Sequence, residues 1–281
     1  MKIGFHVSIK GGIDKTVDRA KELKCNTFQM FTRSPRMWKA RELEDSEIKK
    51  FREKISYSEI SPIFSHMPYL SNLASPNHEI YKKSCNALKE EIKRCILLDV
   101  PYIVTHIGSH KGLGKEKGVK NVSYALNRIT SEFKSSPLIL LENTSGKKHD
   151  IGSTFQEIRE IIEQVNPKLG VCFDTCHAFA RGYDLRSKDS IKDVIDAFDK
   201  IIGLRNLHLI HLNDSKGELG SRLDRHQHIG LGAIGEEGFR NILSSKLAEN
   251  PMIMETPIDT IRGNEGNMSK ALELAGLGVN K

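Results

Sequence analysis

Nine side chains that can bind metal ions recur along the chain, most of them where a short apolar, strand-like segment ends. All nine are imidazoles or carboxylates, a mixture of donors that suits Zn²⁺ and could also hold Mn²⁺ or Fe. They are His66, His106, Glu142, Asp174, His177, His211, Asp224, His226 and Glu255. The series predicts one polynuclear metal site that is assembled from distant parts of the sequence.

Each of these positions has a simpler explanation when it is considered by itself. A lone histidine or acid at a strand end is more often a hydrogen-bonded, partly buried side chain, and Asp224-Arg225-His226 could be a charged surface loop. The six strand-end positions together have no comparable explanation, because six unpaired polar groups at one face would be costly. The complete set therefore favours metal binding.

Two features of the series indicate more than one ion. A carboxylate can bridge two cations, so Glu142 or Asp174 could join two metals roughly 3.5–4 Å apart, the separation used in phosphodiester hydrolysis. Asp174 and His177 lie three residues apart on an expected strand-to-loop turn, where both can face one cavity. A third ion held by His177, Asp224 and His226 would keep an open position for water or substrate.

The segments that must position these donors alternate between strand-like and helix-like patterns. The strand-like segments are residues 3–7, 27–31, 62–65, 102–105, 138–141, 170–173, 207–211 and 252–254. The amphipathic segments are residues 14–23, 47–55, 79–98, 119–133, 154–165, 190–202 and 238–247. This alternation implies a parallel sheet, and eight strands in this length fit an α/β (β/α)₈ TIM barrel better than a doubly wound sheet.

The spacing of the strand-end donors supports the barrel. Successive donors between His66 and Glu255 are separated by 32 to 44 residues, which is about one βα unit, and each lies at the carboxyl end of its strand. In a barrel these ends converge on one face, where active sites form. Since no linker or composition shift divides the chain, we expect residues 1–281 to form a single TIM-barrel domain.

The composition is that of a globular protein, with 38% hydrophobic and 28% charged residues and no run of membrane-spanning length. The first residues lead directly into a strand-like pattern without a secretory signal, and the five cysteines include no CxxC pair. Both observations favour reduced thiols and a cytoplasmic location. The formal charge of +7 is compatible with a polyanion partner or with an ordinary lysine-rich surface. A monomer is the default expectation.

Two segments near the donors could contact a nucleic acid. The segment after the second strand carries Arg33, Arg36 and Trp38; arginine fits phosphate geometry and an aromatic ring can stack on a base. Packing of Trp38 against a helix, with solvated arginines, is equally compatible with the sequence. Tyr69 and Leu70 could wedge into a duplex beside the metal site, although packing within their own loop is the more ordinary interpretation.

These motifs resemble the endonuclease IV family of metal-dependent apurinic/apyrimidinic endonucleases, and the similarity extends over nearly the whole chain. The blocks that carry it are Gly4-Phe5-His6-Val7-Ser8, Leu140-Leu141-Glu142-Asn143-Thr144, Val171-Cys172-Phe173-Asp174-Thr175-Cys176-His177-Ala178-Phe179, His211-Leu212-Asn213-Asp214-Ser215-Lys216, Gly220-Ser221-Arg222-Leu223-Asp224-Arg225-His226 and Glu255-Thr256. The resemblance implies a TIM barrel with three zinc ions, Mn²⁺ being possible at one site.

The resemblance also assigns the donors to individual ions. The expected sets are His66, His106 and Glu142 for the first ion, Glu142, Asp174, His211 and Glu255 for the second, and His177, Asp224 and His226 for the third. Glu142 is thereby the expected catalytic residue, as the carboxylate that bridges two metals.

The activity that the resemblance implies is DNA repair by base excision. Such enzymes hydrolyse the backbone of double-stranded DNA on the 5′ side of an abasic site, leave a 3′-hydroxyl, and also trim blocked 3′ ends. Arg36, Tyr69 and Leu70 match the positions that enter the DNA and open the lesion. The chain departs from the family pattern at Met37, where a glutamine often helps fill the DNA stack, and at Ile107, where a proline is common.

Two other functions remain to be weighed against this one. A sugar isomerase or epimerase also uses a barrel with histidine and carboxylate ligands, but the third donor set and the arginines at 33 and 36 argue against a small enclosed sugar pocket. A DNA-binding module that kept metals only for structure is the other alternative. Open coordination positions argue against it, since structural zinc sites are usually closed.

Overall fold

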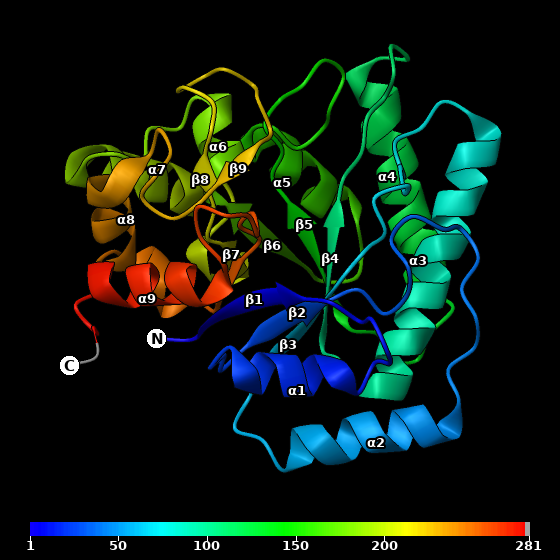
Figure 1. Cartoon of the computed structure of the whole chain (residues 1–281). Coiled ribbons are helices and arrows are strands. Elements are labelled where there is room, and N and C mark those ends of the chain that lie inside the picture. Colours follow the sequence, from blue (N-terminus) through cyan, green and yellow to red (C-terminus); the bar gives the residue numbers. More distant parts are fainter. Residues whose placement is uncertain (279–281) are drawn as a thin grey trace.

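Eight parallel strands close into a barrel in the order β1-β10-β7-β6-β5-β4-β3-β2 (Figure 1). They are β1 (Ile3–Val7), β2 (Phe28–Met30), β3 (Ile63–His66), β4 (Tyr102–His106), β5 (Leu138–Glu142), β6 (Leu169–Asp174), β7 (Leu207–His211) and β10 (Met252–Met254). The computed structural model describes residues 1–278. Parallel pairing of Ile3 with Met252 joins the first strand to the last. The predicted α/β class and (β/α)₈ TIM barrel are confirmed.

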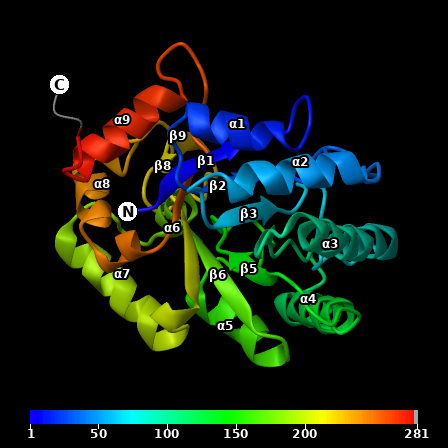
Figure 2. The same ribbon diagram turned by 90° about the horizontal axis from the view of Figure 1, so that it is seen from below.

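Helices cover the outside of the barrel and form a ring around it when the molecule is seen from below (Figure 2). They are α1 (Lys15–Glu22), α2 (Asp45–Ser56), α3 (His78–Leu98), α4 (Lys115–Thr130), α5 (Phe155–Gln164), α7 (Lys188–Ile201), α8 (Gly235–Leu243) and α9 (Asn264–Leu274). Short 3₁₀ turns at Leu204–Asn206 and Lys246–Glu249 precede β7 and β10. Among residues 1–278, none of the helices combines the length and the apolar character that crossing a membrane requires.

A short helix, α6 (Thr175–Arg181), begins directly after β6, where the sequence predicts a strand-to-loop turn. The side chain of Asp174 caps it by accepting a hydrogen bond from the His177 N–H at 2.7 Å, and Gly182 ends it with a φ of 116°. Its side chains from Thr175 to Ala180 are all buried. The turn prediction is wrong here because a helix that is buried all round shows no amphipathic pattern.

A small antiparallel pair, β8 (Asp214–Ser215) with β9 (His226–Gln227), lies in the segment between β7 and α8. Neither this pair nor α9 is expected from the sequence patterns. The pair matters for the site because the chain leaves β7 at His211, passes through β8, and comes back to the site at His226, the first residue of β9.

The interior of the barrel contains one fully buried side chain from each of six strands. We call this set the interior apolar layer; it consists of Phe64, Val104, Leu140, Cys172, Leu209 and Ile253. The corresponding position on β1 is Gly4, where a Cβ would lie 1.8 Å from the carbonyl oxygen of Thr27. The barrel is therefore a packed core rather than a pore, and it forms a floor for whatever lies at its carboxyl end.

Candidate metal centre

Two residues after each member of the interior apolar layer comes a potential metal ligand. The pairs are Phe64 and His66, Val104 and His106, Leu140 and Glu142, Cys172 and Asp174, Leu209 and His211, and Ile253 and Glu255. Because strand side chains alternate between faces, residues two apart point to the same side, here the barrel interior. Five of these ligands end their strands and Glu255 directly follows β10. The six side chains therefore meet at the carboxyl end of the barrel.

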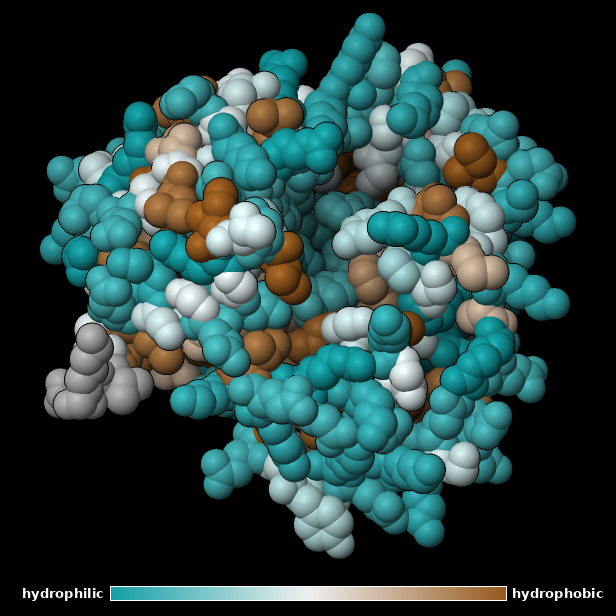
Figure 3. Space-filling model, viewed as in Figure 1, coloured by the Kyte–Doolittle hydropathy of each residue, from teal (hydrophilic) through white to brown (hydrophobic). Residues whose placement is uncertain are grey.

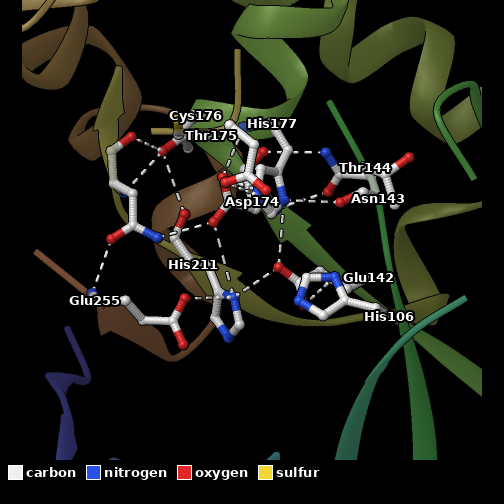
Figure 4. A network of polar contacts seen from close by, with 12 residues as sticks. His106, Glu142, Asn143, Thr144, Asp174, Thr175, Cys176, His177, His211 and Glu255 are labelled. Carbon is white, nitrogen blue, oxygen red and sulfur yellow. Dashed lines mark hydrogen bonds and ion pairs between the residues drawn. The ribbon is translucent and has the colours of Figure 1, made fainter. Parts of the chain in front are cut away.

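Glu142 lies at the centre of the cluster and faces histidines on two sides (Figure 4). Its Oε2 atom is 3.2 Å from Nε2 of His66 and 3.5 Å from Nδ1 of His106. Its Oε1 atom is 3.2 Å from Nδ1 of His211 and 3.3 Å from Nδ1 of His177. Each carboxylate oxygen thus serves a different group of donors, which is the arrangement that a bridging carboxylate needs.

The second group of donors surrounds one nitrogen of His211. Its Nδ1 atom lies 3.2 Å from Oε1 of Glu142, 3.4 Å from Oε2 of Glu255 and 3.8 Å from Oδ2 of Asp174. Donor atoms of these four residues all lie within 4.8 Å of one another, as do those of His66, His106 and Glu142. These two groups consist of the same residues that the resemblance assigns to the first and the second ion.

The third group differs in part from the expected set. Donor atoms of His177 and His226 lie within 4.8 Å of Asp174, and Nε2 of His226 is 3.6 Å from Oδ2 of Asp174. Asp224 lies on the other side of His177, with its Oδ1 atom 3.1 Å from Nε2 of that ring. Its Oδ2 atom pairs with Nζ of Lys147 at 2.9 Å. Asp224 therefore approaches the group from the solvent side, where a lysine already balances its charge.

The charges in this cluster depend on one another. Burial alone would raise the pKa of Glu142, but the histidines around it lower that pKa well below its ordinary value. Burial alone would lower the pKa of His177 and of His211. Asp174, Asp224 and Glu142 raise the pKa of His177 well above its ordinary value, and Cys172, Glu255 and Glu142 do the same for His211. The hydrogen bond from His177 lowers the pKa of Asp224. The cluster thus holds ionised carboxylates among histidines that attract protons, and metal ions compete with protons for such donors.

Hydrogen bonds from outside the cluster aim several of the rings. Nδ1 of His66 lies 2.7 Å from the carbonyl oxygen of Met67, and Nδ1 of His226 lies 3.2 Å from that of Glu255. A ring nitrogen beside a carbonyl carries the proton, which leaves the lone pair on Nε2, the atom that faces the acids. Asn213 similarly fixes Asp174 by donating to its Oδ2 atom at 2.8 Å.

The donors present suit a bound cation. Nε2 of His226 is buried and has no hydrogen-bond partner within residues 1–278. The backbone contact at Nδ1 leaves a lone pair on this atom, and it points at a carboxylate only 3.6 Å away. Two electron-rich groups at that separation repel each other unless a proton or a metal ion lies between them. Histidine nitrogens and carboxylate oxygens are ligands that Zn²⁺ accepts.

Two strands contribute polar residues that the sequence interpretation missed. His6 on β1 and Gln29 on β2 face the same interior, and Nδ1 of His6 lies 3.2 Å from Oε1 of Glu255. We call these two residues and the six strand-end ligands the polar layer. The signal was available, because His6 follows Gly4 by the same two-residue step that separates each ligand from the interior apolar layer.

An open cleft of about 540 Å³ lies beside the cluster and is lined in part by Tyr69, Leu70, His106, His177 and Asp224. Figure 3 shows a hydrophilic hollow near the middle of the face, with apolar side chains next to it. Tyr69 and Leu70 are 63% and 38% exposed. They are therefore placed for contact with a ligand in the cleft rather than packed into their loop.

The arginines after β2 have opposite environments. Arg36 is exposed, as is its neighbour Met37, whereas Arg33 is buried. The guanidinium of Arg33 faces the buried carboxylate of Glu91, with Nε 3.6 Å from Oε2, and donates to the carbonyl oxygen of Ala87 at 3.1 Å. The predictions that Arg33 is solvated or contacts a phosphate are therefore wrong. Trp38 is half-buried and packs against the core, as the packing alternative proposed.

The second departure from the family pattern, Ile107, is fully buried. Its Cδ1 atom would lie 2.3 Å from a Cβ placed on Gly152, so the isoleucine fills a space left by that glycine. The residue therefore contributes to the packing of the segment after β4 against the segment before α5.

The chain is similar to known proteins over nearly its entire length. A family model described as "Xylose isomerase-like TIM barrel" matches residues 17–275. A protein of Methanoculleus marisnigri named "Probable endonuclease 4" is 49% identical over 98% of this chain and 99% of its own length. A protein of the same name from Nitrosopumilus maritimus is 47% identical over 98% of this chain and its own full length.

Solved structures agree with these relatives. The crystal structure of endonuclease IV from Thermus thermophilus superimposes with a TM-score of 0.85 at 35% identity and covers 99% of this chain and 98% of that one. A D-tagatose 3-epimerase-like protein matches with a TM-score of 0.69 at 20% identity, covering 98% of each chain. The second likeness concerns the fold alone, because its sequence identity is low.

Proposed function

Since the chain belongs to the endonuclease IV family, we propose that it is a metal-dependent DNA-repair hydrolase that cleaves the backbone of double-stranded DNA 5′ to abasic sites. We propose further that it uses three zinc ions, leaves a 3′-hydroxyl and also trims blocked 3′ ends. The 281 residues would act as one domain and as a monomer in the cytoplasm.

The observation that carries this proposal is the position of Glu142 between two groups of donors. Its two oxygens face His66 and His106 on one side and His211 on the other, at 3.2 to 3.5 Å. The first ion would be held by His66, His106 and Glu142, and the second by Glu142, Asp174, His211 and Glu255. For the third ion, His177 and His226 supply the nitrogens, and Asp224 supplies a carboxylate that must exchange Lys147 for the ion.

When bound, such ions lower the pKa of a coordinated water towards about 7 and offset the charge that builds on the phosphoryl oxygens. The protein holds the donors in place before substrate arrives, because Asn213, Met67 and the backbone of Glu255 fix the orientation of Asp174, His66 and His226. A protein thiol is a poor alternative nucleophile. Burial raises the pKa of both Cys172 and Cys176 to about 12.

Selection for a damaged site would come from the exposed side chains around the cleft. An abasic nucleotide has no base to unstack, so turning it out of the duplex costs up to a few kcal/mol less than for an intact nucleotide. Tyr69 and Leu70 stand at the cleft, and Arg36 is exposed on the loop after β2. We propose that these three residues contact the opened duplex. The exposed thioether of Met37 would add apolar contact area beside Arg36.

The proposal is tested with a 5′-labelled duplex that contains one abasic-site analogue. The zinc-loaded protein should cut the labelled strand once, 5′ to the lesion, and a DNA polymerase should extend the product without further processing. A chelator should stop the reaction and added Zn²⁺ should restore it. A second duplex with a 3′-phosphate tests trimming.

The control is the same duplex with an intact base, which should remain uncut. Binding of the lesion without cleavage by the zinc-loaded protein would contradict the enzyme and support a DNA-binding module. Turnover of free ketoses with added Mn²⁺, in the absence of any cleavage, would instead support an epimerase.

A further inference from the structure

We propose that Gln29 is a positioning residue that orients two ligands of the second ion, His211 and Glu255, through a single side-chain amide. The inference rests on the metal-binding part of the proposed function. Gln29 lies on β2, one of the two barrel strands that supply none of the proposed ligands, and it is fully buried.

Three hydrogen bonds define the environment of this amide. Its Nε2 atom donates to Oε1 of Glu255 at 2.8 Å, and it lies 2.9 Å from Nδ1 of His6. Its Oε1 atom lies 2.9 Å from Nε2 of His211. Both amide hydrogens and the carbonyl oxygen are therefore used, and all three partners belong to the polar layer.

The chemistry of the partners fixes which way the amide points. An ionised carboxylate only accepts hydrogen bonds, so the nitrogen end of Gln29 must face Glu255 and the oxygen end must face His211. An oxygen in that place can only accept, which requires a proton on Nε2 of His211. The lone pair of the neutral ring is then on Nδ1.

That nitrogen is the one surrounded by carboxylates. Nδ1 of His211 lies 3.2 Å from Glu142 and 3.4 Å from Glu255, so the amide directs the lone pair to the place where a cation would be bound. The same amide occupies Oε1 of Glu255 and leaves Oε2 facing His211. One side chain thus selects the ligand atom of two residues that are 44 positions apart in the sequence.

The contact with His6 extends the network to β1. Nδ1 of His6 lies 2.9 Å from Nε2 of Gln29 and 3.2 Å from Oε1 of Glu255, so it contacts both groups at the nitrogen end of the amide. His6 therefore uses the second amide hydrogen of Gln29 and holds the amide against rotation.

The test measures zinc binding without DNA. Gln29→Met keeps the length of the side chain and removes all three hydrogen bonds. We expect it to weaken the binding of one of the three zinc ions about 10- to 100-fold, the usual effect of losing such an outer contact. In the zinc-saturated protein, the Nε2 proton of His211 should be protected from exchange with water and give a resonance in ¹⁵N-edited NMR spectra. In Gln29→Met this resonance should disappear, because the proton exchanges with water.

Two further variants separate positioning from a general loss of stability. Gln29→Glu restores an acceptor opposite His211 and should recover the protected resonance. Thr27 directly precedes β2, at the end of the strand away from the ligands. Thr27→Val removes its hydrogen bond from Oγ1 to the carbonyl oxygen of Pro62 at 2.6 Å. It should leave zinc binding and the resonance unchanged.

The inference is overturned if Gln29→Met binds three zinc ions as tightly as the unaltered protein, or if Thr27→Val weakens zinc binding equally. Either result leaves the proposed nuclease standing, because cleavage is measured separately. Failure of the unaltered protein to bind zinc at all would overturn both proposals.

Discussion

The interior apolar layer and the polar layer lie on the same strands, face the same interior and are separated by only two residues, yet their environments are opposite. Leu140 is surrounded by apolar side chains and has no polar group to satisfy. Glu142, one step further along β5, has four histidine nitrogens within 3.5 Å. Burial is nearly complete in both cases, at 0% and 1% exposure.

The difference shows how one barrel divides stability from chemistry. Buried apolar side chains stabilise the fold by leaving water, whereas the polar layer gathers charged groups whose pKa values move in opposite directions. Such a cluster lowers stability unless ions or protons balance it. The two layers should therefore respond differently to substitution, which Glu142→Gln and Leu140→Ala test directly. Changes at Tyr69 and Lys147 extend the comparison to the cleft and to the third group of donors.

Glu142→Gln should have the largest effect. The amide keeps the shape of the side chain but loses the charge and one acceptor oxygen, so the two ions beside it lose their shared ligand. We expect cleavage of the abasic duplex to fall by about 10³-fold or more. Cleavage rates, zinc content by elemental analysis and circular dichroism measure this. Near-normal turnover would refute a bridging role for Glu142.

Leu140→Ala, in the interior apolar layer, should lower the stability of the fold without loss of zinc. Removal of a fully buried leucine leaves a cavity in the barrel and should lower the free energy of unfolding by about 2–5 kcal/mol. Zinc content below the unfolding transition should remain unchanged. Chemical denaturation with and without zinc measures both quantities. A loss of zinc as large as that of Glu142→Gln would mean that the two layers cannot be separated.

Tyr69→Ala tests a residue of the cleft that belongs to neither layer. Loss of an aromatic contact with the opened duplex should weaken lesion binding by about 1–3 kcal/mol without loss of zinc. Fluorescence anisotropy with a hydrolysis-resistant abasic duplex measures the affinity. Tyr124→Ala is a matched control, since Tyr124 is 62% exposed and lies on α4. Equal affinities of the two variants would exclude the contact.

Lys147→Ala should have the smallest effect of the four changes, and it should strengthen zinc binding. The ammonium of Lys147 lies 2.9 Å from Asp224, where it competes with a cation at the third group. Because both side chains are partly exposed, we expect zinc to bind this group only about two- to fivefold more tightly in the variant. Zinc titration with Lys148→Ala as the control measures this. Weaker binding after Lys147→Ala would show that the lysine supports the site instead.

The strands and most of the site follow from local patterns in the sequence. A donor at the end of an apolar run is visible because β5 reads as Leu-Ile-Leu-Leu followed by Glu142, and a parallel barrel then brings such ends together. The same pattern hides Gln29, since it lies inside β2 rather than at its end and an amide is not expected among metal ligands. Gln29 would be found only by aligning β2 with its neighbouring strands and counting two residues on from the position level with the interior apolar layer.

Other features depend on contacts that no local pattern contains. Arg33 is buried because Glu91, on α3, offers it a carboxylate that is itself fully buried. Asp224 lies beside Lys147 in the segment that connects β8 with β9, and the length of that segment does not fix the position of the side chain. Side chains of loops are therefore less predictable than those of strands, even when their residue types are informative.

Closure of the barrel by its last strand has a consequence for synthesis of the protein. β10 joins β1 through Ile3 and Met252, and Glu255 follows at once. A ribosome-bound chain that has not yet reached Met252 has Glu142, Asp174 and His211 of the second group but not Glu255. Its first strand also has no neighbour on one side. Tight capture of ions at that group must therefore wait until β10 and Glu255 have been made, so a chain truncated before Met252 should release zinc readily.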